Sequence, residues 1–200
     1  MAADQQPQPA PVAPPRLRLR WLSVVVAVMV VLTGGWPLAN ALVANRHRLA
    51  AGSTLRIGPS ATDSARFTVG PGWLQVPSQT NPFISYALRR GSLQVSVLFV
   101  ALVNTSQKPE LWTGLRKLVQ AGNPGARLGG PVTVVTTAGN RGLTGTLTAG
   151  GMTGLASAFP SPSKGFAIEI VALGPRTRHL LNVRATRLLM LSLRFPPAPR

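Results

Sequence analysis

The chain contains 200 residues, of which 45% are hydrophobic and 12% charged, and its formal net charge is +17. The absence of cysteine excludes disulfide scaffolds, iron–sulfur clusters, cysteine-ligated zinc, cysteine nucleophiles and a lipid-modified cysteine. Four Asp and Glu residues and two His residues supply little material for acid–base or metal chemistry. We therefore expect a protein with one folded domain that is not an enzyme, with no catalytic residues, cofactor or metal.

The N-terminal region combines a proline-rich stretch, a basic cluster and a long uncharged segment. Residues 1–15 show no hydrophobic periodicity, which is typical of a disordered tail. Residues 21–45 contain no charged side chain, and about 20 apolar residues suffice to cross a bilayer. We therefore expect residues 1–20 to form a cytoplasmic tail and residues 21–45 to form a transmembrane helix. The basic flank of this helix consists of Arg16, Arg18 and Arg20.

The segment 21–45 fits two descriptions, an uncleaved signal anchor and a cleavable signal peptide. Its most apolar part, residues 22–32, has the length of a signal-peptide core, and Ala39-Asn40-Ala41 matches a signal-peptidase site. The uncharged stretch nevertheless continues to residue 45, and the region before it is long for a signal peptide. We favour the anchor, with cleavage after Ala41 as the alternative. The expected anchor residues include Trp21, Leu22, Val30, Leu32 and Trp36.

The orientation of this segment does not follow from counting charges, because basic residues flank it on both sides. The cluster before it abuts the apolar core, as in a signal sequence. A long folded domain also translocates largely regardless of its charge. We therefore expect a single-pass protein of the cell membrane, with its N-terminus in the cytoplasm, the lipid bilayer as a partner and residues 46–200 outside the cell.

The exported part is expected to comprise a stalk over residues 46–65, a domain over residues 66–195 and a disordered end over residues 196–200. Alternating apolar residues predict strands and helical spacing predicts two helices. Trp73 and Phe99 are expected in the core. Strands are predicted over 83–88, 92–103, 131–137, 143–148, 152–159 and 166–173, and helices over 108–121 and 178–191. Within the stalk, residues 55–57 are a further candidate for a short strand.

Each predicted helix carries an apolar stripe that should face the sheet. Short connections between successive strands favour an antiparallel arrangement. The resulting fold class is α+β, with one antiparallel sheet and two helices packed on it. The first stripe contains Leu111, Leu115, Leu118 and Val119, and the second contains Leu181, Ala185 and Leu188.

Several short sequences in this order resemble a known fold. They are FTVGPGW at residues 67–73, the strand SLQVSVLFVAL from Ser92, PVTVVTTAGNRG from Pro131 and SLRF at residues 192–195. Together they resemble the Mog1/PsbP-like fold over about residues 66–195, and are similar to actinobacterial exported domains of the LpqN/DcrB type. The resemblance implies a small binding or accessory module without an active site, and it transfers no functional residues.

These observations favour a membrane-anchored, non-enzymatic binding or accessory module at the cell envelope of a high-GC actinobacterium, with envelope or secretion-complex proteins as partners. A carrier or sensor of a small apolar or lipid ligand is the first alternative, and a cavity between sheet and helices would favour it. A basic nucleic-acid-binding protein is the second, although the arginines are scattered and an exported domain meets no genome, so no nucleic acid is expected. The positive charge reflects either compositional bias or binding to anionic lipids or wall polymers.

Overall fold

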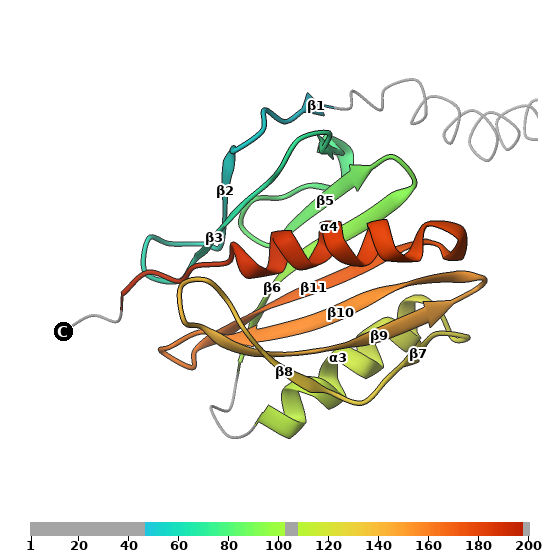
Figure 1. Ribbon diagram of the computed structural model, residues 1–200. Coiled ribbons are helices and arrows are strands. Elements are labelled where there is room, and N and C mark those ends of the chain that lie inside the picture. Colours follow the sequence, from blue (N-terminus) through green and yellow to red (C-terminus); the bar gives the residue numbers. More distant parts are fainter. Residues whose placement is uncertain (1–46, 103–107, 198–200) are drawn as a thin grey trace, which may run out of the picture. The chain divides into compact units, whose positions relative to one another are not determined.

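The computed structural model describes residues 47–102 and 108–197 (Figure 1). The predicted anchor residues and their basic flank therefore lie outside the described part of the chain. No helix among the described residues is long and apolar enough to cross a membrane.

A nine-stranded antiparallel sheet forms the centre of the described domain. Its strands follow the order β1-β4-β5-β6-β11-β10-β9-β7, and β8 pairs with β9 beside β7. Strands β2 and β3 form a separate antiparallel pair. The bounds are β1 His47–Arg48, β2 Thr54–Ile57, β3 Ala65–Thr68, β4 Leu74–Gln75, β5 Ser85–Arg90, β6 Leu93–Ala101, β7 Arg127–Leu128, β8 Val132–Val135, β9 Arg141–Ala149, β10 Met152–Pro160 and β11 Phe166–Pro175.

Two α-helices, α3 (Lys108–Gly122) and α4 (His179–Leu191), cover opposite faces of this sheet (Figure 1). Short 3-10 helices, η2 (Pro77–Gln79) and η3 (Arg176–Arg178), precede β5 and α4. Alternate residues of a strand point to opposite faces, and β11 divides its side chains accordingly. Ile168 and Ile170 belong to the core under α4, whereas Ala167 belongs to the core under α3. The domain therefore has three layers with two hydrophobic cores.

The two cores differ in the size of their side chains. The core under α4 contains the largest buried residues, among them Phe67, Trp73, Phe159 and Phe166. The core under α3 is lined on the sheet side largely by alanine, and it receives Trp112 from the helix. The alanines are Ala149, Ala156, Ala158 and Ala167.

The structure confirms an antiparallel sheet with two helices packed on it and places most strands where alternation predicts them. Trp73 is buried, as expected. Phe99 is only half-buried, although it packs on the core under α4 and stacks on Phe166 with ring centroids 4.8 Å apart. Strand β5 begins at Ser85 rather than at Phe83, because the backbone turns at Asn81, whose carbonyl oxygen accepts bonds from the amides of Ile84 and Ser85.

The segment treated as a stalk, residues 46–65, contributes two strands to the described domain. Strand β1 pairs with β4, and β2 pairs with β3. Ile57 of β2 is completely buried in the core under α4. The folded part therefore extends about 20 residues further toward the N-terminus than residue 66.

Candidate functional site

The described residues contain no cluster of three or more His, Cys, Asp or Glu side chains that could hold a metal ion. The acidic side chains come from different elements, with Asp63 in the β2–β3 connection, Glu110 on α3 and Glu169 on β11. The described acidic side chains therefore do not gather into one site.

A groove of about 510 Å³ lies along one side of α4. Its other walls are the connection between β3 and β4 and the tight turn between β5 and β6. The groove is lined by Thr68, Gly70, Pro71, Trp73, Arg90, Gly91, Ser92, Leu93, Arg178, Leu181, Asn182, Arg184, Ala185, Leu188 and Leu189.

The turn between β5 and β6 is short because glycine stands at its first position. Arg90 pairs with Leu93, which leaves Gly91 and Ser92 as the connecting residues. Gly91 has a φ of 59°, and such a positive φ at the first turn position is typical of a type II′ hairpin. The turn fixes Arg90 at the end of β5, on the opposite side of the groove from α4.

Helix α4 presents two leucines to this groove instead of to the core. Leu181 is 66% exposed and Leu188 is 60% exposed. The two lie on the same side of the helix because seven residues make nearly two turns of about 3.6 residues each. The predicted buried stripe of Leu181, Ala185 and Leu188 is therefore wrong at both leucines. The residues that α4 buries are Asn182, Ala185, Thr186, Leu189 and Met190.

Contacts with β11 explain the rotation of α4. Asn182 lies against Gly174, where an added Cβ would come within 2.5 Å of the Asn182 amide nitrogen. The Asn182 side-chain amide donates a hydrogen bond to the Pro175 carbonyl at 3.2 Å, which satisfies a polar group that would otherwise be costly to bury. Thr186 donates to the Asn182 carbonyl at 2.8 Å. The polar residues Asn182 and Thr186 therefore face the sheet, where hydropathy alone would place leucines.

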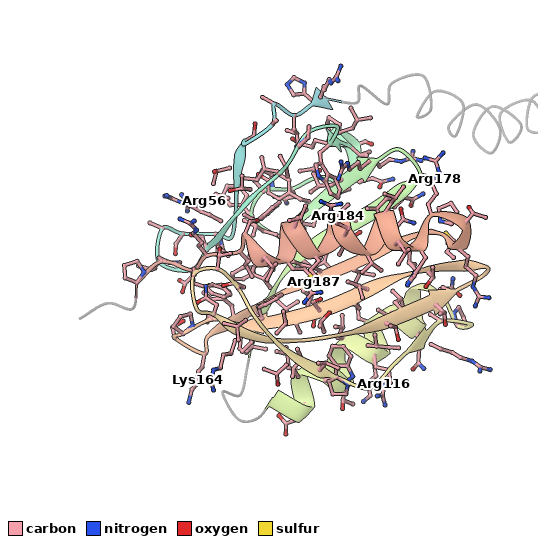
Figure 2. All side chains as sticks on the ribbon, in the orientation of Figure 1. Arg56, Arg116, Lys164, Arg178, Arg184 and Arg187 are labelled. Atoms are coloured by element: carbon pink, nitrogen blue, oxygen red, sulfur yellow. The ribbon has the colours of Figure 1, made fainter. Side chains whose placement is uncertain are left out.

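Three arginines surround the groove. Arg178 precedes α4, Arg184 lies on its exposed side, and Arg90 lies across the groove, and all three side chains are exposed. No carboxylate is among the lining residues of this groove. Figure 2 shows Arg184 on the side of α4 toward β5 and Arg187 on the side toward β10. The groove therefore combines an apolar wall with uncompensated positive charge.

A second group of arginines lies outside the groove, on three adjacent backbone segments. Arg56 pairs with Arg66 in the β2–β3 ladder. Arg66 and Arg194 exchange two backbone hydrogen bonds of 2.8 Å. Directly opposed residues have Cβ atoms about 5 Å apart and face the same side. The exposed side chains of this arginine row, Arg56, Arg66 and Arg194, therefore repel one another.

Buried polar groups are found on both faces of the sheet. Glu169 is 3% exposed, and its place in the alternation of β11 directs it toward the α3 face. Burial raises the pKa of its carboxyl from the ordinary 4.5 to about 7. The Trp112 Nε1 and His179 Nδ1 atoms are buried without a hydrogen-bond partner among the described residues. None of these three residues lines the groove.

No protein-family model matches the chain, and no curated protein matches it in sequence. Among solved structures, it is similar to PsbP (CyanoP) from the cyanobacterium Synechocystis sp. PCC 6803, with a TM-score of 0.52 and 15% identity over 74% of this chain and 95% of that one. The Ran-binding protein Mog1p of Saccharomyces cerevisiae matches with a TM-score of 0.49 and 8% identity, over 72% of this chain and 96% of that one. The likeness to PsbP confirms the expected Mog1/PsbP-like fold. At these identities it shows the fold alone.

None of the residues predicted to attach the chain to a membrane lines the groove. Trp21, Leu22, Val30, Leu32 and Trp36 lie outside the described residues, as does the basic flank. The groove was not anticipated, because its leucines were assigned to the core. The signal that could have revealed it is the spacing of Asn182, Thr186 and Leu189, which lie at positions i, i+4 and i+7 of one alternative helix face.

Proposed function

We propose that this chain is a single-pass, membrane-anchored, non-enzymatic binding module of the cell envelope, and that the groove beside α4 is its binding surface. The observation that carries the proposal is the exposure of Leu181 and Leu188 on a helix that buries Asn182 and Thr186 instead. A helix normally turns its leucines toward the core. Leucines left at the wall of a groove are available to a ligand.

The membrane attachment is supported by the uncharged sequence from residue 21 to residue 45 and by the arginines before it. The absence of a carboxylate from the groove lining argues for recognition rather than acid–base chemistry at this surface. The alternative function, a carrier or sensor of a small ligand, gains support from the same groove. The groove lies between α4 and the β3–β4 and β5–β6 connections. The core directly beneath α4 is packed.

A site-specific cross-linking experiment tests this function in the full chain. Because the sequence contains no cysteine, Leu188→Cys introduces a unique attachment point for a thiol-linked benzophenone in the groove. Leu180→Cys is the matched control, since Leu180 is 81% exposed on the same helix and does not line the groove. We expect light-dependent adducts of defined mass at position 188 in host-cell membranes and far fewer at position 180.

Three results would contradict the proposal. Equal adducts at the two positions, or none at position 188, would remove the groove as the binding surface. External protease that leaves the C-terminal part intact in whole cells, but degrades it after lysis, would place the domain on the cytoplasmic side instead.

A further inference from the structure

We propose that the groove binds an anionic lipid, with the negatively charged headgroup held by Arg90, Arg178 and Arg184 and an alkyl chain lying against Leu181 and Leu188. This inference rests on the proposed function, because it names the chemical class of the ligand for the same groove. Three properties of the groove support it: its charge, its apolar wall and its size.

The charge of the groove favours a negatively charged ligand. A guanidinium stays protonated at any physiological pH, and its planar array of donors fits phosphate or carboxylate oxygens in a bidentate manner. Arg90 reaches the groove from the β5–β6 turn, and Arg178 and Arg184 reach it from the side of α4. These charges come from opposite walls, with no carboxylate in the lining, so an anion between them would be contacted from both sides.

The apolar wall requires more than an anion. Leu181 and Leu188 lie nearly in line along α4, and the deeper part of the groove is formed by Leu93, Leu189 and Trp73, which are buried. An inorganic anion would leave the two leucines in water. An alkyl chain lying along α4 would cover both of them, and removal of such apolar surface from water is favourable.

The size of the groove favours a small amphiphile over a folded protein. Its volume of about 510 Å³ falls within the range of roughly 300–1,000 Å³ that is typical of small-molecule sites. A stable protein partner would cover about 800 Å² on each side. The hollow shape and the grouping of charge around it therefore point to one lipid molecule.

Binding of lysophosphatidylglycerol to the purified full chain tests the inference. The chain is held in an uncharged detergent, and bound lipid is counted by native mass spectrometry. Lysophosphatidylcholine of the same chain length tests the need for net negative charge, and inorganic phosphate tests the need for the alkyl chain. We expect one lysophosphatidylglycerol per chain, about tenfold or more weaker binding of lysophosphatidylcholine, and no retained phosphate.

Matched variants of α4 separate the groove from the general positive charge. Arg184→Gln and the double variant Leu181→Ser/Leu188→Ser should each weaken lysophosphatidylglycerol binding about tenfold or more. Arg187→Gln makes the same change as Arg184→Gln, and Leu180→Ser replaces one exposed leucine, both on the same helix but outside the groove lining. Both variants should bind as the original chain does. All of these side chains are exposed, and an unchanged near-ultraviolet circular dichroism spectrum confirms that each variant is folded.

The outcomes distinguish this inference from the proposed function. Equal binding of the two lysolipids, or an equal loss in Arg184→Gln and Arg187→Gln, would overturn the lipid assignment. Protein adducts at position 188, combined with no lysophosphatidylglycerol binding, would also overturn it while leaving the groove as a binding surface. The absence of both adducts and lipid would contradict the two proposals together.

Discussion

Helices α3 and α4 cover opposite faces of one sheet but use their apolar residues differently. Helix α3 buries Leu111, Leu115 and Val119, most of the stripe that helical spacing predicts, and adds Trp112. Helix α4 buries two polar residues, Asn182 and Thr186, together with Ala185, Leu189 and Met190. It leaves two leucines exposed beside the groove. Helix α3 leaves one leucine of its stripe exposed, Leu118, whereas α4 exposes both leucines of its predicted stripe, Leu181 and Leu188.

The sheet faces under the two helices help to explain this difference. Alanines and Gly145 line the α3 face, and an added Cβ at Gly145 would meet the Trp112 ring at 2.8 Å. The helix supplies the large side chains there. On the α4 face the sheet itself supplies large side chains such as Phe159 and Phe166, so α4 fills the core with fewer leucines. The core under α4 is therefore filled without Leu181 and Leu188, which stay exposed.

The largest expected effect is a difference in stability between substitutions at two neighbouring leucines of α4. Leu189 is buried, so Leu189→Ala should destabilise the domain by about 2–5 kcal/mol through lost burial and a residual cavity. Leu188→Ala should change the free energy of unfolding by no more than about 0.5 kcal/mol, because that side chain lies at the surface. Thermal unfolding of the two variants measures the difference. Similar losses would mean that Leu188 packs in the core after all.

The second effect concerns the buried carboxyl on the α3 face. Below pH 4.5 Glu169 is protonated in both folded and unfolded chains, but between pH 4.5 and about 7 only the folded chain keeps the proton. Stability should therefore fall by up to about 3 kcal/mol as the pH rises through this window, and then level off. Glu169→Gln should remove this part of the dependence in unfolding measurements from pH 4 to pH 8. An unchanged pH profile in that variant would assign the dependence to other groups.

A third, smaller effect tests why α4 has its observed rotation. Asn182→Ala removes the hydrogen bond to the Pro175 carbonyl and should cost about 1 kcal/mol. Gln120→Ala, an exposed change on α3, should stay within about 0.5 kcal/mol. Denaturant midpoints provide the measurement. A stabilising Asn182→Ala would show that the polar pair under α4 does not determine its orientation.

The smallest effect concerns the arginine row on the α4 side of the molecule. Arg66 lies opposite both Arg56 and Arg194, so Arg66→Thr should relieve like-charge repulsion and stabilise the domain by about 0.2–1 kcal/mol. The gain should shrink in 1 M salt, where the screening length is about 3 Å. Arg116→Thr on α3 is the control, and a gain of the same size there would attribute the effect to net charge.

The sequence was sufficient to predict the fold class and most strands, because alternation in β6 and β11 is a strong local signal. It also predicted α3 and the buried positions Leu111, Leu115 and Val119 of its stripe, but it was wrong at Leu118, which is 45% exposed. It did not predict the rotation of α4, because that rotation depends on Gly174 and Pro175 of β11, which contact Asn182 only in the folded chain. The groove depends on the same rotation, so it could not be found from hydropathy. The β1 pairing was also missed, since two residues carry no periodicity.

Strand β1 is the part of the described domain on which tension from the N-terminal side would act first. It joins the sheet at an edge through only two residue pairs, His47 with Gln75 and Arg48 with Leu74. The next backbone bond along the chain runs from the Leu49 amide to the Trp73 carbonyl, at 3.0 Å. A pull on the N-terminal end of the domain would load these bonds one after another, beginning at the sheet edge. Because Trp73 lines the groove and is also buried in the core under α4, tension that passes Leu49 would reach the groove wall and that core together.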